Sequence, residues 1–254
     1  MVTSQLFNQG LCYDHNMTQR LKPFTLAIDI GGTGLKMIVL DRKGRPITKR
    51  VKVETPQPAK PNAIIDVLMS MILDQGEFDR ISVGFPGVVT HGIVKTAPNL
   101  DPSWHDYPLQ KELEKLTGKA TLVANDADVQ GYGDIKGKGL EMMITLGTGM
   151  GSALFIDGNL VPNLELGHHP FKKNYTYEEL LGKKGLKTAG KRKWNKHLTE
   201  AIDLMARIFN YDRLYIGGGN AELVSIDLPR NVSLSSNLAG LLGGIKLWEK
   251  HPPK

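Results

Sequence analysis

Two short glycine-rich segments have the residue types of an anion-binding site. The first reads Asp29-Ile30-Gly31-Gly32-Thr33-Gly34, and the second reads Leu146-Gly147-Thr148-Gly149-Met150-Gly151. A glycine turn between two strands points successive backbone N–H groups into one concavity, where they bind phosphate oxygens without a side-chain cation. The hydroxyl groups of Thr33 and Thr148 add further donors. One such turn is most often an ordinary tight hairpin, but two turns of the same pattern predict a phosphate site.

Two aspartates have positions suited to phosphoryl transfer. Asp29 precedes the first turn, where it can hold a magnesium-bound water against phosphates, because Mg²⁺ keeps several waters and takes few protein carboxylates. Asp126 follows Asn125 at the end of an apolar strand, from which a polar pair can reach a cleft. We select Asp126 as the catalytic base, which orients a hydroxyl group and accepts its proton late in the transfer. The alternatives are a turn cap for Asp29 and a helix N-cap for Asp126, and the second is compatible with catalysis.

Glu165 and His168 place a carboxylate and an imidazole three residues apart, beside Gly167. Zinc binding is one alternative, but two His and one Glu without Cys make a poor set for an ion that takes three or four well-placed ligands. Recognition of hydroxyl groups fits better. Asn99, in the loop TAPNLDPSW, supplies a further amide, although such an Asn is more often a turn residue. Polar groups of this kind give a bound sugar its orientation and specificity.

A basic segment runs from Lys172 to Lys196, with nine Lys or Arg residues against two acidic ones, Glu178 and Glu179. A solvated helical surface is the first interpretation. The alternative is a track for a phosphate polymer, whose binding should weaken as salt rises.

The elements around the first turn are strands. Residues 24–30 (FTLAIDI) are an apolar run rich in β-formers, and residues 35–40 (LKMIVL) resume the pattern after the glycines. A dinucleotide-binding glycine motif leads from a strand into a helix, so this pattern excludes a Rossmann site.

The first turn opens a lobe with the predicted order βββαβ. Residues 41–44 signal a turn, and residues 45–53 continue as a third strand. Beyond the proline-rich stretch 55–62, apolar positions from Ile64 to Ile72 predict an amphipathic helix with Asn62 as its N-cap. The strand ISVGF at 81–85 completes the lobe.

The same order begins again at TLVAN (121–125), followed by EMMITL (141–146), the second glycine turn and GSALFI (151–156). Asp157-Gly158 supplies a hairpin turn, and Gly147 lies 115 residues after Gly32. This repeat of a whole lobe predicts two similar lobes around a cleft. We expect a polar lead at 1–22, an N-terminal lobe at 23–120 and a C-terminal lobe at 121–236.

A strand that runs into three glycines, RLYIGGGN (213–220), precedes a final helix at about 237–250. This helix is expected to pack back onto the N-terminal lobe. Gly240, Gly243 and Gly244 lie inside it, and each costs about 1 kcal/mol relative to Ala. Another backbone or a ligand must therefore approach the helix closely.

The bulk composition limits the class of protein. The chain has 41% hydrophobic and 23% charged residues, and no apolar run approaches the roughly 20 residues of a membrane span. The opening segment lacks the pattern of a secretory signal, so we expect a cytoplasmic protein that binds neither membrane nor nucleic acid. Its single cysteine, Cys12, excludes an intramolecular disulfide and a multi-cysteine zinc site, and Met17 is an alternative start. The net charge of +6 is compatible with a polyanionic partner but decides nothing.

Taken in order, these motifs resemble those of the ROK sugar-kinase family, and most closely those of its polyphosphate glucokinase branch. The resemblance covers about residues 22–249, and the ordered set is specific although each motif alone is weak. It rests on the segments DIGGTG, GFPGVV (84–89), TAPNLDPSW, NDAD (125–128), TLGTGMGSALF, ELGH (165–168) and YIGGGN (215–220).

The resemblance implies an α/β, actin-like ATPase (ribonuclease H-like) fold, with two duplicated βββαβ-type lobes hinged about a cleft. It also implies a Mg²⁺-dependent transfer from ATP or polyphosphate to the 6-hydroxyl of glucose, and often a homodimer. Carried over by motif, Asp126 would be the base, and the sugar hydroxyls would be held by Asn99, Asn125, Asp126, Glu165 and His168. The phosphoryl donor would face Asp29, Gly31, Gly32, Thr33, Gly34, Lys36, Thr148 and Gly149, with Gly217, Gly218 and Gly219 beside it.

The chain departs from the family pattern in two places. Typical members carry a cysteine-rich zinc motif after the segment that corresponds to ELGH, and its absence from this sequence favours the polyphosphate-type branch, which also lacks it. A further sugar-binding glutamate is ambiguous, because Glu178 and Glu179 are adjacent.

Two rival functions stay open. The first is an ATP-dependent kinase for another hexose or an amino sugar, which the sequence discriminates poorly. The second is a sugar-sensing regulator without catalytic activity. Family members of that kind carry a helix-turn-helix domain of roughly 60 residues or more before the first glycine turn. About 23 residues precede Phe24 here, and they lack helical periodicity.

Overall fold

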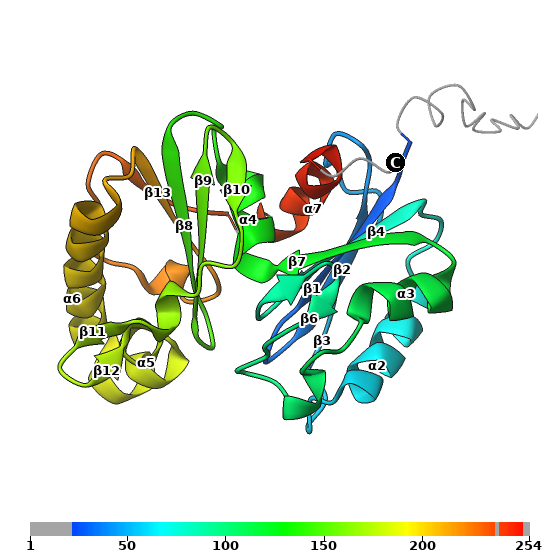
Figure 1. Cartoon of the computed structure of the whole chain (residues 1–254), viewed down its shortest axis with the longest axis horizontal. Helices are drawn as coiled ribbons and strands as arrows, with labels where there is room; N and C mark the ends of the chain where they lie inside the picture. Colours follow the sequence, from blue (N-terminus) through cyan, green and yellow to red (C-terminus); the bar gives the residue numbers. More distant parts are fainter. Residues whose placement is uncertain (1–21, 237–238, 251–254) are drawn as a thin grey trace, which may run out of the picture.

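The computed structural model describes residues 22–236 and 239–250. It has two lobes, each built on a five-stranded sheet (Figure 1). The first sheet has the order β3-β2-β1-β4-β7. Strands β1, β2 and β3 form an antiparallel meander, whereas β4 and β7 run parallel to β1. Its strands are β1 (Thr25–Ile30), β2 (Leu35–Leu40), β3 (Val51–Val53), β4 (Arg80–Phe85) and β7 (Ala120–Asn125).

The second sheet repeats this arrangement, with the order β10-β9-β8-β13-β14. Its first three strands are again an antiparallel meander, β13 pairs in parallel with β8, and β14 pairs in parallel with β13. Its strands are β8 (Leu140–Leu146), β9 (Met150–Ile156), β10 (Asn159–Val161), β13 (Arg213–Gly217) and β14 (Val232–Leu234). The predicted duplication of a lobe that opens with a glycine-turn hairpin is therefore confirmed. Each glycine turn joins the first two strands of its lobe.

Two expectations about strands need correction. The strand at 121–125 was assigned to the C-terminal lobe, but β7 pairs with β4 in the first sheet, so the boundary lies after Asn125 and not at residue 121. The third strand is predicted over residues 45–53, but only Val51–Val53 forms a strand paired with β2. Apart from this strand, the segment makes one isolated bridge, between Leu40 and Pro46. Neither error is visible locally, because a strand's sheet and its paired length depend on its partner.

Helices cover the outer face of each sheet and complete two separate cores (Figure 1). In the first lobe these are α2 (Pro61–Leu73) and α3 (Leu109–Thr117), and in the second α5 (Tyr177–Leu181) and α6 (Lys183–Phe209). Helix α2 buries Ile64, Leu68 and Ile72, as the spacing predicts. Its N-cap is Lys60 and not Asn62, because Pro61 occupies the first helical turn.

Two short hairpins and three 3-10 turns complete the part of the chain that the structure describes. They are β5 (Val89–Thr90) with β6 (Ile93–Val94), β11 (Pro170–Lys172) with β12 (Tyr175–Thr176), η1 (Pro102–Trp104), η2 (Leu166–His168) and η3 (Ala221–Leu223). Among the described residues, no helix is both long enough and apolar enough to cross a bilayer.

Helices α4 (Asp126–Asp134) and α7 (Ala239–Lys250) pack on each other between the two sheets (Figure 1). Their contact requires glycine, because a Cβ added to Gly243 would lie 1.7 Å from the Val129 carbonyl oxygen of α4. A Cβ added to Gly133 of α4 would likewise meet the Ala239 carbonyl oxygen at 2.2 Å. Leu241 and Ile245 of α7 also pack on the first sheet, beside Ala27. The expected close approach to α7, which a backbone makes here, and the expected packing of α7 on the N-terminal lobe are both present. The expected start of this helix at residue 237 lies outside the described residues.

The polar lead at 1–22, with Cys12 and Met17, lies outside the described residues except for Lys22.

Candidate active site

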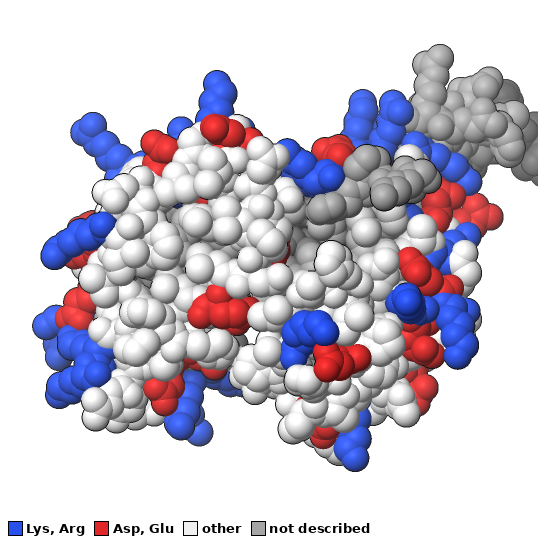
Figure 2. All heavy atoms as spheres, in the orientation of Figure 1, with Lys and Arg blue, Asp and Glu red and all other residues white. Residues whose placement is uncertain are grey.

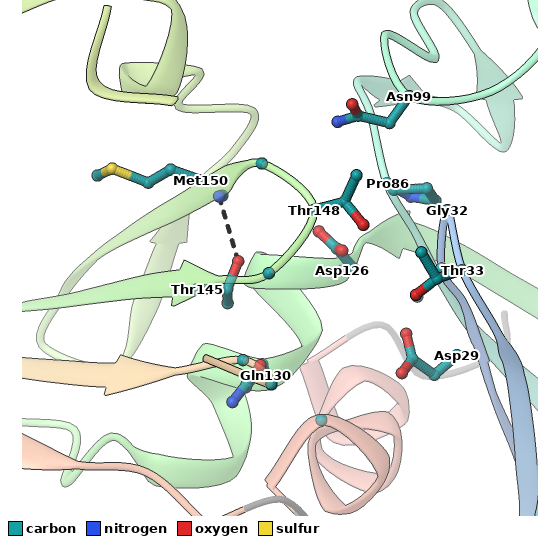
Figure 3. Close-up of a pocket in the computed structure, with 18 of the residues that line it drawn as sticks. Asp29, Gly32, Thr33, Pro86, Asn99, Asp126, Gln130, Thr145, Thr148 and Met150 are labelled. Atoms are coloured by element: carbon teal, nitrogen blue, oxygen red, sulfur yellow. Dashed lines mark hydrogen bonds between the residues drawn. The ribbon is translucent and has the colours of Figure 1, made fainter. Parts of the chain in front are cut away.

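A pocket of about 410 Å³ opens between the lobes, and residues of both sheets line it (Figure 3). The strands bring their turns and loops to this edge because the two lobes share one topology, so equivalent ends face the same cleft. The predicted residues that line it are Asp29, Gly31, Gly32, Thr33, Gly34, Lys36, Asn99, Asn125, Asp126, Thr148, Gly149, Glu165, His168, Glu178, Gly218 and Gly219.

One predicted residue, Gly217, does not line the pocket. It is the buried last residue of β13, and a Cβ added there would lie 2.0 Å from Nε2 of Gln130. Gln130 lines the pocket at this place instead. The glycine is therefore needed to seat the glutamine, which corrects the expectation that all three glycines of this run face the donor.

The two glycine turns lie opposite each other across the cleft. A Cβ added to Gly32 of the first turn would lie 3.6 Å from Oγ1 of Thr148 in the second turn. Figure 3 shows Thr33 and Asp29 on one side, and Thr148 and Asp126 facing them from the other. An anion bound here would touch both lobes at once.

Internal hydrogen bonds occupy the carbonyl oxygens of the second turn. The Gly147 carbonyl accepts from the backbone N–H of Lys183 at 2.9 Å and from Nδ2 of Asn220 at 3.0 Å. The Thr148 carbonyl accepts from the same Lys183 N–H at 3.1 Å. These carbonyls would otherwise repel an anion. The Gly147 N–H donates to the Gly149 carbonyl at 3.0 Å and the Met150 N–H lies 3.4 Å from Oε2 of Glu178, so the amide groups left to a ligand are those of Thr148 and Gly149.

Asp126 begins α4 directly after β7. The cap of the helix is the preceding residue, Asn125, whose Oδ1 accepts from the backbone N–H of Ala127 at 2.8 Å and of Asp128 at 3.3 Å. Asp126 itself accepts from the Ala127 N–H at 2.8 Å and is half-buried in the pocket wall. Because Asn125 does the capping, the carboxylate of Asp126 stays available to a ligand.

Burial raises the pKa of Asp126 to about 8, and the negative charges of Asp29, Glu165 and Asp128 contribute in the same direction. Desolvation disfavours the charged form, and like charges add to that cost. A carboxyl group with a pKa near neutral is a better base than an ordinary one at physiological pH. A perturbed carboxyl in a cleft also marks a functional site.

Asp29 and Lys36 are opposite each other in the β1–β2 ladder, and their side chains form an ion pair at 2.7 Å. Both are partly exposed to the pocket. The ammonium group of Lys36 and the carboxylate of Asp29 are therefore both present at the first turn.

The other half of the pocket gathers the remaining polar residues. Glu165 lies 3.4 Å from Nε2 of His168 and accepts from Nδ2 of Asn125 at 3.4 Å. The same Asn125 amide donates to the Gly87 carbonyl at 3.1 Å. Burial raises the pKa of Glu165, against the opposing effect of His168.

The adjacent pair Glu178 and Glu179 is divided by the start of α5. Glu179 forms a capping box with Thr176, in which each side chain bonds the other's backbone N–H, at 2.9 and 3.2 Å. Glu178 lines the pocket, and its Oε2 lies 3.4 Å from the Met150 N–H. Of the two candidates, only Glu178 faces the cleft.

Sequence reasoning missed several lining residues, among them Lys52, Gln130, Thr145, Lys183 and Asn220. Gln130 could have been predicted, because it lies four residues after Asp126 and so shares its helix face. Lys52 sits opposite Lys36 in the β2–β3 ladder, which only the register reveals.

Comparison with known proteins adds to this geometry. The sequence profile of the ROK family matches residues 25–179. The chain is 34% identical over 241 residues to a polyphosphate glucokinase of Mycobacterium tuberculosis, with 85% of this chain and 88% of that protein covered. It is also 33% identical over 146 residues to a glucokinase of Streptomyces coelicolor, which covers 54% of this chain and 44% of that protein.

Solved structures agree. An inorganic polyphosphate/ATP-glucomannokinase from Arthrobacter sp. strain KM superposes with a TM-score of 0.82 at 29% identity, covering 91% of this chain and all of that one. A ROK family glucokinase from Streptomyces griseus, solved with glucose and AMPPNP, superposes with a TM-score of 0.73 at 22% identity, covering 89% and 99%. The second likeness shows the fold alone, which is the actin-like ATPase fold expected from the motifs. On the sequence profile, the duplicated lobes and the relatives, this chain belongs to the ROK family.

Proposed function

We propose that the protein transfers a phosphoryl group from polyphosphate or ATP to the 6-hydroxyl of glucose, giving glucose 6-phosphate. One observation carries the proposal: Asp126, whose pKa is raised to about 8, lines one pocket together with both glycine turns and a group of polar side chains from Asn99, Asn125, Glu165, His168 and Glu178. Family membership and the polyphosphate glucokinase and glucokinase relatives support the choice of reaction.

On the acceptor side, the sugar ring would lie among Asn99, Asn125, Glu165, His168 and Glu178. These groups accept and donate hydrogen bonds from several directions, which fixes the ring so that its 6-hydroxyl meets Asp126. Asp126 then orients this hydroxyl and takes its proton as the new P–O bond forms.

On the donor side, the terminal phosphoryl group would rest between the two turns, in contact with Gly32, Thr33, Thr148 and Gly149. Amide and hydroxyl donors stabilise the negative charge on the equatorial oxygens as the group is transferred. Lys36 and Lys183 would attract the phosphates that follow it.

The implied Mg²⁺ fits the residues present. Asp29 is a partly exposed carboxylate beside the first turn, and its charge raises the pKa of Asp126, an unfavourable interaction that a cation near both carboxylates would relieve. Magnesium needs only one or two protein carboxylates when phosphates and waters complete its shell. When bound, it would neutralise charge on the donor phosphates, and Asp29 would hold it through water.

The lining residues favour a phosphate chain as donor. In the described part of the chain, no Phe, Tyr or Trp lines the pocket to stack on a base, whereas Lys36, Lys52 and Lys183 all reach it. Lys183 begins α6, and the exposed cations Lys184, Lys187, Lys191 and Arg192 follow it. Lys and Arg gather in Figure 2 at the lower left, where Figure 1 has α5 and α6. A polymer leaving the pocket past Lys183 would meet this basic surface.

A coupled assay that compares polyphosphate with ATP at fixed glucose tests the proposal. We expect turnover with polyphosphate, and an affinity for it that falls steeply as salt rises, because several lysines release counterions on binding. Activity with ATP alone would reject polyphosphate as the donor. Activity with neither donor would reject the kinase and favour a sugar-sensing role.

A second acceptor class has one observation in its favour. A hollow of about 510 Å³ adjoins the sugar half and shares Pro98, Glu165 and His168 with the main pocket, and its wall includes Val88, Ala97, Leu100 and Pro102. An acylated amino sugar would find apolar space there for its substituent. The same assay run with a panel of hexoses and N-acyl amino sugars decides between them, and the better kcat/KM identifies the acceptor.

The raised pKa of Asp126 predicts an unusual pH profile. Below about pH 8 the group takes up a proton and is lost as a base, so kcat/KM for glucose should fall about tenfold per pH unit there, and not only below pH 4. Asp29→Asn should move this limb to lower pH, since it removes a like charge. The midpoint of the limb is the measurement, because it is independent of the maximal rate. A profile that stays flat from about pH 5 to 8 would contradict the assignment of Asp126 as base.

The expected homodimer and cytoplasmic location stay predictions, which size-exclusion chromatography with light scattering and cell fractionation address.

A further inference from the structure

Asn163 bridges the two lobes beside the sugar half of the pocket. Its Oδ1 accepts from the Val89 N–H at 3.2 Å, and its Nδ2 donates to the Val89 carbonyl at 3.2 Å. A single side chain thus satisfies both backbone groups of one residue, as a neighbouring strand would. Val89 is buried and belongs to β5 of the first lobe, whereas Asn163 follows β10 of the second.

The bridge joins the two walls between which the sugar would lie. On one side, Val89 follows Pro86 and Gly87, which line the pocket. On the other side, Asn163 precedes Glu165, and the residues next to Glu165 are fixed to the second lobe. Oγ of Ser152 donates to the Leu164 carbonyl at 2.6 Å and accepts from the Leu166 N–H at 3.1 Å. Since this segment is already held in its own lobe, the Asn163 amide sets the local distance between the two sugar-side walls and not the shape of the loop.

The backbone at Asn163 supports a specific role for its side chain. Its φ is +60°, in the left-handed region that Asn and Gly adopt most readily. The same loop approaches α4, where the Asn163 N–H lies 3.5 Å from Oδ2 of Asp128. The left-handed turn aims the amide at Val89.

We propose that Asn163 is a positioning residue for the acceptor, and that its amide holds the Pro86–Val89 wall and the Glu165–His168 wall at the separation that the sugar requires. The proposal rests on the proposed function, because the acceptor is the sugar. Without the bridge, the binding-competent spacing is populated for only a fraction of the time, and the apparent affinity for the sugar falls by that fraction. The donor half and Asp126 should be unaffected, because α4 contacts both sheets and α7 packs on α4 and on the first sheet, and these contacts do not involve Asn163.

The test is Asn163→Gly, which keeps the left-handed backbone and removes only the amide. We expect the KM for glucose to rise about tenfold, equivalent to about 1.4 kcal/mol, with the KM for the donor and kcat within about twofold of wild type. Asn163→Asp keeps the acceptor for the Val89 N–H but loses the donor and adds a charge near Glu165 and Asp128, so its effect on the KM for glucose should be larger. Calorimetric titration with glucose alone measures the same change as a Kd.

Asn210→Gly is the matched control. Asn210 also has a left-handed backbone, with φ of +51°, but it ends α6 and lies away from the pocket. It should leave both KM values unchanged. An unchanged KM for glucose in Asn163→Gly would overturn the inference while leaving the kinase intact, and so would an equal rise in both KM values, which indicates general damage. Failure of the wild-type protein to phosphorylate glucose would instead overturn the proposed function. The wild-type protein therefore tests the proposed function, and Asn163→Gly tests the inference.

Discussion

Asp126→Asn is expected to lower kcat by about 10²–10⁴-fold, the range for loss of a positioned base. The amide keeps the size of the carboxylate and can still accept from the Ala127 N–H, so the fold should be retained. The KM for glucose should change little, because asparagine still offers a hydrogen bond to the 6-hydroxyl. Steady-state kinetics with saturating donor measure the effect.

The same substitution should stabilise the protein. The pKa of Asp126 is about 8 when folded against 3.8 in the unfolded chain. Stability is therefore lost as pH rises from about 4 to about 8, because the unfolded chain releases this proton while the folded protein retains it. Asparagine removes this cost. Each unit of difference is worth about 1.4 kcal/mol, and even part of it would raise Tm by several degrees at pH 8. The gain over wild type should shrink at pH 5, where the wild-type group is protonated.

Asp134→Asn is the control for Asp126→Asn. Asp134 ends the same helix, outside the pocket, and burial also raises its pKa. It should alter stability in the same direction and leave kcat near the wild-type value. If Asp126→Asn retained near-normal turnover, or lost activity together with Tm, the catalytic assignment would be wrong.

Gly243→Ala is expected to destabilise the protein by about 2–4 kcal/mol, with a fall in Tm of about 5–15 °C. The added Cβ would lie 1.7 Å from the Val129 carbonyl oxygen and 3.1 Å from the Gly133 nitrogen, so α4 and α7 must move apart. A helix backbone cannot yield as a flexible side chain can. Since α4 carries Asp126 at its first residue, turnover should fall with stability. Thermal unfolding and kinetics on the same preparation follow both quantities.

Gly240→Ala, three residues earlier in α7, is the matched control. A Cβ there would meet only Cβ of Gln130, at the ordinary contact distance of 3.9 Å. Alanine also has the higher helix propensity, so stability should stay level or rise by up to about 1 kcal/mol. Equal effects of the two substitutions would show that helix propensity, and not the α4–α7 contact, sets the need for glycine in this helix.

The glycine turns show which features can be predicted from residues that are neighbours in the sequence. A strand, a glycine turn and a second strand are specified by neighbours in the chain, so both turns and their duplication could be predicted. The close approach of a backbone or a ligand to α7 could also be predicted, and the structure shows a backbone at Gly243. Asn125 and Asp126 were likewise predictable at a strand end. It could not be predicted which of the two caps the helix, because this depends on the directions of the two side chains.

Features that depend on partners far along the chain could not be predicted. The place of β7 in the first sheet follows from its pairing with β4, and Lys52 reaches the pocket only through its register against Lys36. Gly217 is one of three consecutive glycines, yet the side chain of Gln130, from another element, covers it. Glu178 and Glu179 are chemically identical, and the helix start at Thr176 decides which one faces the cleft.

The sequence by itself predicted two lobes, two glycine turns suited to anions and one candidate base, because each of these features depends on residues that are neighbours in the chain. The tertiary structure alone decided how these parts meet: the opposition of Gly32 and Thr148, the raised pKa of Asp126, and the amide of Asn163 against Val89. The reason is physical, since electrostatic and hydrogen-bond energies depend on distances in space, and the 74 residues that separate Asn163 from Val89 say nothing of the 3.2 Å between their bonded atoms.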